Sequence, residues 1–228
     1  MGLGSIPAVI HYSNTPSLHH PIRYWCGMTG WNRWRTIEEV RADAVVCCRC
    51  DLCYGRTHVV FGEGPTPARL MIVGEGPGAE EDRLARPFVG RAGKLLDTLL
   101  ADAGMRREDI WITNVVRCRP VIRSASGERN RPPRADEIKA CDLWMTQEYR
   151  FAAPELVVCL GAVPAQALIS RSFTISEGRG RWLEGRDGIP TTATYHPAYV
   201  LRLRGQDRRI IESQMLEDFR SAARRFAA

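Results

Sequence analysis

Residues 68–78, Ala-Arg-Leu-Met-Ile-Val-Gly-Glu-Gly-Pro-Gly, decide the fold of this chain. The apolar run from Leu70 to Val73 predicts a buried strand, and the glycines behind it predict a tight turn at its carboxyl end. Open α/β sheets place their ligand sites at this end of their strands. The stretch therefore predicts both a sheet and a site beside it.

Other strands and helices alternate along the chain. The predicted strands are 68–74, 109–116, 156–161 and 189–195. The predicted helices, from their apolar spacing, are 36–46, 92–104, 134–151, 162–169 and 207–226. Residues 119–133 are polar and carry three prolines, which predicts a long loop. The alternation predicts an α/β fold, a three-layer α/β/α sandwich around a mainly parallel sheet of about four strands.

The composition is that of a globular protein with one main domain. Its 228 residues are 44% hydrophobic and 25% charged, enough to bury a full core. We expect a partly irregular N-terminal extension over 1–44 and a catalytic domain over 45–228. No apolar run approaches the ~20 residues that span a bilayer, and no secretory signal is evident. A cytoplasmic monomer without membrane contact is expected.

The charge balance favours a polyanionic partner. The formal net charge is +6, and arginine far outnumbers lysine. Arginine fits phosphate groups bidentately, and many of these arginines lie around the motifs described here. A mildly basic enzyme without a nucleic-acid partner has the same balance, so charge alone does not decide.

Eight cysteines without a secretory signal favour a metal or cluster site over disulfides. Two overlapping Cys-x-x-Cys pairs lie within 47–53, and Cys118 and Cys141 follow at a distance. Such a set suits either a tetrathiolate zinc or an iron–sulfur cluster. Spacing alone does not distinguish zinc from iron, nor does it distinguish the pair Cys47 and Cys50 from the pair Cys50 and Cys53. Cys159 lies inside a predicted strand and is expected to be a core residue.

A second motif, Tyr-His-Pro-Ala-Tyr-Val-Leu-Arg over 195–202, follows the last predicted strand. It shares the carboxyl edge of the sheet with the glycine turn and with the Arg-Pro-Phe-Val-Gly segment 86–90. Together these segments offer the carboxylate of Glu75, the ring of Phe88 and the imidazole of His196. Such groups can hold a planar ring and stabilise charge as a bond to it breaks.

These motifs, in this order, resemble those of the family 4 uracil-DNA glycosylases, the iron–sulfur branch of that superfamily. The matching segments are 60–64, 74–78, 86–93, 113–120 and 195–202. The resemblance covers about Cys47 to Phe226. It implies a monofunctional glycosylase that hydrolyses the N-glycosidic bond of uracil in single- or double-stranded DNA. The product is an abasic site that enters base excision repair.

The resemblance also selects among the cysteines. The residues after Cys50, with Leu52 and then Gly55-Arg56, match the family's pattern behind the second cysteine of its pair. Cys48 and Cys53 then have no role as ligands. The implied cofactor is a structural [4Fe-4S] cluster with the ligands Cys47, Cys50, Cys118 and Cys141.

The implied uracil pocket contains Gly76, Phe88 and Asn114. Phe88 offers a ring face for stacking, and the Asn114 amide can accept from uracil N3–H and donate to O4. Cytosine presents the opposite pattern and is rejected. His196 is expected to donate to uracil O2, where negative charge develops.

A carboxylate is expected to orient the attacking water and to stabilise the cationic sugar. Glu75 is favoured for this role. Glu81 and Asp82 are alternatives, and the other possible role for each of the three is to accept from backbone N–H groups in the glycine turn.

Two segments are expected to bind the DNA backbone. Arg91 and Gly93 open a predicted helix, where phosphate binds favourably. Tyr199, Leu201 and Arg202 resemble a loop that enters the minor groove, with apolar residues wedged into the stack. The alternative for that loop is a short hydrophobic segment packed on the body.

Asn130 bears on the mechanism. The loop 120–131 is longer than in ordinary family 4 members, and a related branch with a long loop has a histidine at this position that becomes covalently bonded to the abasic sugar. A carboxamide is a weak nucleophile, so Asn130 favours turnover over capture. Covalent capture of uracil-containing DNA and a non-catalytic DNA-binding module are the two alternatives.

Overall fold

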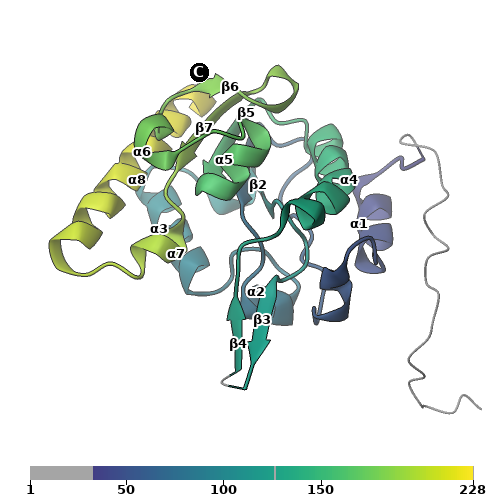
Figure 1. The fold of residues 1–228 in the computed structure, drawn as a ribbon. Coiled ribbons are helices and arrows are strands. Elements are labelled where there is room, and N and C mark those ends of the chain that lie inside the picture. The colour runs from purple at the N-terminus through teal and green to yellow at the C-terminus, as the bar shows by residue number, and fades with distance from the viewer. Residues whose placement is uncertain (1–32, 126, 228) are drawn as a thin grey trace, which may run out of the picture. The chain divides into compact units, whose positions relative to one another are not determined.

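A five-stranded sheet organises the molecule (Figure 1). The computed structural model describes residues 33–125 and 127–227, so the predictions for residues 1–32 lie outside the described residues. The sheet order is β2-β1-β5-β7-β6. Its strands are β1 (Leu70–Gly74), β2 (Ile110–Asn114), β5 (Leu156–Leu160), β6 (Leu183–Glu184) and β7 (Pro190–Thr194).

The α/β fold class is confirmed, with one addition to the sheet. The four long strands are the predicted ones and run parallel, whereas β6 pairs antiparallel with β7 at the edge. The sheet thus has five strands in place of about four. A strand of two residues is too short to produce a detectable hydrophobic period.

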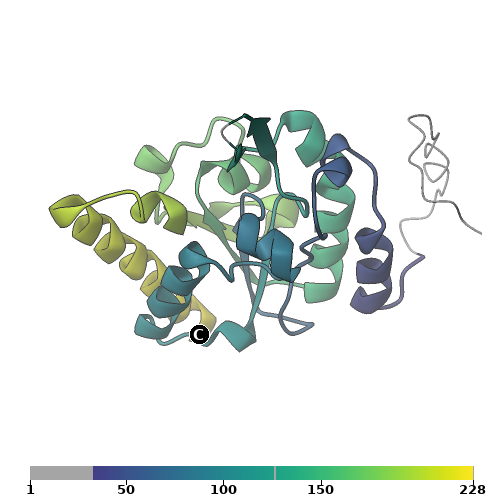
Figure 2. The same ribbon diagram turned by 90° about the horizontal axis from the view of Figure 1, so that it is seen from below.

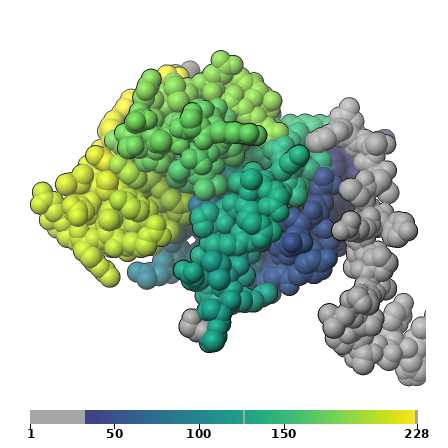
Figure 3. All heavy atoms as spheres, in the orientation of Figure 1, coloured from purple at the N-terminus to yellow at the C-terminus, as the bar shows by residue number. Residues whose placement is uncertain are grey.

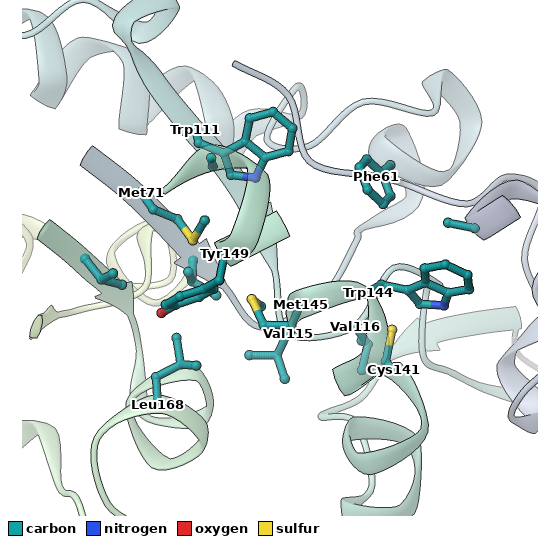
Figure 4. Close-up of a cluster of buried hydrophobic side chains, with 14 of the residues drawn as sticks. Phe61, Met71, Trp111, Val115, Val116, Cys141, Trp144, Met145, Tyr149 and Leu168 are labelled. Atoms are coloured by element: carbon teal, nitrogen blue, oxygen red, sulfur yellow. The ribbon is translucent and has the colours of Figure 1, made fainter. Parts of the chain in front are cut away.

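Helices cover both faces of the sheet. They are α1 (Ile37–Val45), α2 (Ala79–Leu84), α3 (Arg91–Asp102), α4 (Ala135–Ala152), α5 (Ala162–Leu168), α6 (Ile175–Gly178), α7 (Pro197–Val200) and α8 (Gly205–Ala227). The core is divided accordingly into two clusters of buried residues. On β1, Met71 packs with Met145 of α4 (Figure 4), whereas Ile72 packs among residues of α3 and α8. Burial on both faces explains why β1 is continuously apolar.

 Helix α1 packs against α4. The rings of Trp34 and Trp144 lie 5.8 Å apart between the two helices, and Val40 and Ala44 of α1 are buried in the same core cluster as α4. The division of the chain at residue 44 stays a prediction. None of the helices in the described ranges has the length and apolarity needed to cross a membrane.

The predicted loop over 119–133 is wrong in its central part. This segment forms two antiparallel strands, β3 (Val121–Ser124) and β4 (Gly127–Asn130). They make a hairpin that extends from the carboxyl edge of the sheet (Figure 1). Its strands are rich in arginine and mostly exposed, so they lack the apolar alternation that reveals a half-buried strand. A cross-strand ion pair between Arg123 and Glu128 stabilises the pairing.

A buried ion pair joins the end of β2 to α4. The Arg117 guanidinium lies 2.8 Å from the Glu148 carboxylate, and the two side chains are 1% and 0% exposed. Glu148 also accepts from the backbone N–H of Gly62 and the indole N–H of Trp111. The carboxylate therefore connects three segments that meet beneath the sheet's edge.

Glu148→Ala should lower the free energy of unfolding by about 3–5 kcal/mol, because it leaves the Arg117 charge buried without a partner. Urea denaturation followed by circular dichroism measures this loss. Asp109→Asn is the control, since it breaks an exposed ion pair with Arg106 and should change stability little. Equal losses in the two variants would contradict the structural role of Glu148.

Candidate active site

The predicted site residues follow the carboxyl ends of neighbouring strands. Gly74 ends β1 opposite Asn114, which ends β2. His196 follows β7 and caps the N-terminus of α7. Gly161, which follows β5, has a φ of +95°, and a Cβ there would lie 3.2 Å from the Cβ of His196. This close approach brings the end of β5 against the imidazole.

Phe88 and Asn114 meet at Gly74, and His196 lies next to Phe88. A Cβ at Gly74 would overlap both the Cζ of Phe88 and the Oδ1 of Asn114. The Phe88 and His196 rings lie 6.1 Å apart at an angle of 33°. Gly76 lies beside Val116 and Pro120, on the next turn of the same loop. The ring of Phe88 therefore lies next to both the amide and the imidazole.

Asn114 is buried without a partner. The residue is 1% exposed, and neither its Oδ1 nor its Nδ2 has a hydrogen-bond partner among the described residues. Native proteins pair nearly all such groups. A buried carboxamide with both ends free is therefore suited to a ligand that offers one donor and one acceptor.

The three acidic side chains near the glycine turn differ in their partners. Glu81 accepts from the backbone N–H groups of Gly78, Val89 and Gly90. Asp82 accepts from the N–H groups of Thr57 and His58. No hydrogen bond to the Glu75 carboxylate occurs among the described residues, and burial raises its pKa. Of the three, Glu75 is the carboxylate that remains available to a substrate.

The imidazole of His196 has a defined tautomer. Its Nδ1 accepts from the backbone N–H of Ala198 at 3.1 Å. Burial lowers the pKa of His196 to about 4, and the charge of Arg202 contributes to that decrease. The ring is therefore neutral at pH 7 and carries its proton on Nε2.

A stack of side chains holds Arg202 beside the site. The Tyr195 and Tyr199 rings stack at 5.8 Å, with Arg202 over Tyr199 at 5.9 Å. Arg179 lies over Tyr195 and is bound to Asp218. The charge of Arg202 lowers the pKa of Glu75, opposing the effect of burial. It therefore favours ionised Glu75 and neutral His196 together.

The two predicted DNA-binding segments differ in exposure. Arg91 is exposed at the start of α3, whereas Gly93 is buried, and a Cβ there would overlap the carbonyl of Phe88. In the other segment Tyr199 and Arg202 are exposed. Leu201 is half-buried and lines a groove of about 570 Å³ with residues of α3 and α8.

Asn130 ends the hairpin and lies beside the glycine turn. Its Oδ1 accepts from Arg119 at 2.8 Å. A Cβ at Gly78 would lie 3.6 Å from its Nδ2. The carboxamide therefore borders the site and is held by the hairpin.

Sequence reasoning missed the residues that fix the Phe88 loop. Arg107 donates to the carbonyls of Pro87 and Phe88 and pairs with Glu63. Phe88 itself has a φ of +51°, which is unusual for a residue with a side chain. These contacts join segments far apart in the sequence, and no local pattern indicates them.

The cysteines predicted as ligands line one cavity near α1 and α4, together with Arg56, Arg117 and Trp144. The Arg56 guanidinium lies 3.3 Å from the Cys118 sulfur, and the Trp144 indole N–H lies 3.2 Å from the Cys47 sulfur. The Arg117 backbone N–H lies 3.4 Å from the Cys141 sulfur. Such donors are typical of the surroundings of metal-bound thiolates.

The remaining cysteines in the described part of the chain lie elsewhere. Cys159 is fully buried in β5, which confirms its predicted place in the core. Cys48 is exposed and Cys53 is half-buried. Within the described ranges, no three His, Cys, Asp or Glu side chains lie close enough to hold a single metal ion.

Comparison with known proteins identifies the family. Residues 61–220 match the model of the uracil DNA glycosylase superfamily. A type-4 uracil-DNA glycosylase of Thermotoga maritima is 40% identical over 196 residues, which cover 84% of this chain and 95% of that protein. Type-4 enzymes of Pyrobaculum aerophilum and Archaeoglobus fulgidus are 40% and 37% identical, over 70% and 73% of this chain and 83% of each relative. The chain therefore belongs to the type-4 family of the uracil-DNA glycosylase superfamily.

Proposed function

We propose that this protein is a monofunctional uracil-DNA glycosylase that removes uracil from DNA for base excision repair. The observation that carries the mechanism is the unpartnered carboxamide of Asn114, buried at the end of β2 beside Phe88, whose ring lies 6.1 Å from that of His196. A base in a duplex cannot reach such a pocket, so the nucleotide must leave the stack at a cost of a few kcal/mol.

Asn114 supplies the base specificity. Its Oδ1 accepts from uracil N3–H, and its Nδ2 donates to O4. Cytosine has an acceptor at N3 and a donor at position 4, so both ends of the amide would face like groups. Because these polar atoms are buried, the mismatch leaves them unpaired and disfavours cytosine strongly. The ring of Phe88 stacks on the accepted base, with Gly76 at the wall of the pocket.

His196 and Glu75 act on the glycosidic bond. When C1′–N1 breaks, its electron pair leaves with uracil and places negative charge on O2, while the sugar becomes cationic. Neutral His196 donates from Nε2 to O2, which stabilises the departing anion. Ionised Glu75 stabilises the sugar and orients a water, whose oxygen bonds to C1′. The released proton passes to Glu75 and then to solvent or to the uracil anion.

The DNA backbone is held around this pocket. Arg91 and Arg202 are exposed cations suited to phosphate, and Tyr199 and Leu201 are suited to fill the space left in the stack. Gly93 is best explained by its contact with the Phe88 carbonyl. Its backbone N–H, near the N-terminus of α3, remains suited to a phosphate. The protein is proposed to act as a cytoplasmic monomer on cellular DNA.

The cavity lined by Cys47, Cys50, Cys118 and Cys141 is proposed to hold a [4Fe-4S] cluster. Four thiolate donors and the N–H groups aimed at three of the sulfurs fit such a cluster. Burial raises the pKa of Cys118 to about 12, so a bound cation is needed to stabilise the thiolate. Its role is structural, because it would tie the segment before β1 to β2 and α4.

Covalent capture is disfavoured by Asn130. An amide is a weak nucleophile, and the oxygen of this one already accepts from Arg119. A non-catalytic binding module is disfavoured by the presence of Glu75 and His196 together, since binding DNA requires neither.

Incubation with uracil-containing DNA tests the activity. We expect strand breaks only after alkali and no adduct that survives a denaturing gel. Asn114→Asp and His196→Ala should each lower the single-turnover rate by about 10²-fold or more, with the fold intact by circular dichroism. A stable adduct would support capture, and full activity in both variants would contradict the site.

The two glutamates provide a matched pair. Glu75→Gln should lower the single-turnover rate and leave the melting temperature unchanged. Glu81→Gln should lower the melting temperature, because its amide nitrogen cannot accept from the backbone N–H groups that the carboxylate binds. The reverse outcome would assign the catalytic role to Glu81.

The state of His196 is testable by NMR. The imidazole signal that disappears in His196→Asn should titrate near pH 4, well below the ordinary value of about 6.5. Because burial favours the neutral ring, the contribution of this residue to stability should be present above pH 6.5 and lost as the pH falls through about 4. A titration near pH 6.5 would contradict a donor that is neutral at pH 7.

Removal of a ligand tests the cluster. Cys118→Ser should lose iron, sulfide and visible absorbance, and it should melt at a lower temperature, because the tie between the segments is lost. Cys48→Ser is the control and should keep all of these. Stoichiometric zinc without iron or sulfide in the wild-type protein would exclude the proposed cofactor.

A further inference from the structure

The β3–β4 hairpin has two unlike faces. Residues directly opposite each other in an antiparallel pair share a face. The register pairs Val121 with Asn130 and Arg123 with Glu128 on one face, and Ile122 with Arg129 on the other. We call the first the inner face and the second the outer face.

The inner face is occupied by contacts within the protein. Arg123 binds Glu128 and donates to the carbonyl of Gly55. Arg119 binds Glu128 and Asn130. These bonds fix the hairpin against the segment that precedes β1 and against the glycine turn.

The outer face offers an unpaired cation beside an exposed apolar side chain. Arg129 is exposed and makes no hydrogen bond or ion pair with any described residue. Ile122, its cross-strand neighbour, is 39% exposed. The segment 119–131 contains four arginines and one glutamate. This combination suits a phosphodiester chain, in which phosphates alternate with apolar sugar faces.

The hairpin begins at the proposed active site and extends away from it. Pro120, just before β3, would lie 3.4 Å from a Cβ at Gly76, and Asn130 borders Gly78. Figures 1 and 3 show the hairpin as a projection from the body of the fold. Four extended residues span about 13 Å, which corresponds to about four base pairs of B-DNA. Figure 2, seen from below, shows the hairpin nearly end-on and pointing toward the viewer.

We propose that the outer face of the hairpin is a second DNA-binding surface, with Arg129 on a backbone phosphate within about four base pairs of the flipped nucleotide. This inference rests on the proposed function, since it assumes that the substrate is DNA whose flipped base occupies the pocket beside Gly76. Ile122 lies against the adjacent sugar. The surface reads no base and extends the contact with DNA beyond the lesion.

Binding to a duplex that carries a tetrahydrofuran abasic analogue tests this contact separately from the chemistry. Fluorescence anisotropy should show that Arg129→Ala weakens binding by about three- to tenfold and lowers the salt slope of log K by about 0.9. Arg123→Ala is the matched control. It removes the same charge from the same hairpin, but from the inner face, and should change the salt slope little.

Shortening the DNA identifies the contact. We expect wild-type binding to weaken when one flank, on one side of the lesion, is cut from about ten to about two base pairs. The affinity of the Arg129→Ala variant should not fall further on the short duplex, because this variant has already lost the contact. Arg129→Lys should restore most of the affinity, and melting temperatures should show that each variant is folded.

The outcomes separate this inference from the proposed function. The second surface would be overturned if Arg129→Ala and Arg123→Ala weakened DNA binding equally. It would also be overturned if the effect of Arg129→Ala on binding did not depend on flank length, even if the wild type releases uracil. If the wild type releases no uracil but the flank-dependent contact persists, the glycosylase proposal fails and the DNA-binding surface stands.

Discussion

The absence of a side chain at Gly74 is the constraint on which the pocket depends. Gly74 ends a central strand, and any larger residue would overlap both the ring of Phe88 and the amide of Asn114. Glycine therefore lets two segments close over the end of β1. The same rule acts at Gly93, which allows α3 to begin directly beneath the Phe88 carbonyl. These glycines serve the packing of the site, because their neighbours occupy the space that a Cβ would need.

Neighbours distant in sequence give nearby acidic residues different roles. Glu75 and Glu81 are six positions apart in one glycine-rich stretch. Glu81 binds N–H groups from two turns and so joins the end of β1 to the loop that carries Phe88. The pKa of Glu75 instead depends on burial, which raises it, and on the charge of Arg202, which lowers it. The sequence indicates that a carboxylate acts here, but the choice among them depends on partners that only the fold brings near.

The sequence predicts those parts of the structure whose physical cause is local. The long strands and α4 follow from apolar runs and helical spacing, and the ring, amide and imidazole follow from motifs that resemble those of the family. The hairpin was missed because arginines and a glutamate replace the apolar alternation of its strands. The clamp of Arg107 on the Phe88 loop and the ion pair of Arg117 with Glu148 were missed because their partners are distant in the chain.

The left-handed backbone of Phe88 has a consequence for the timing of substrate capture. This conformation costs about 1–3 kcal/mol, and contacts within the protein maintain it, namely those with Arg107 and Gly93. The pocket is thus pre-organised, and binding of a base requires little further ordering of the protein. The slow event in recognition is then expected on the nucleic-acid side, in the opening of the stack, so that mispaired or single-stranded sites are engaged fastest.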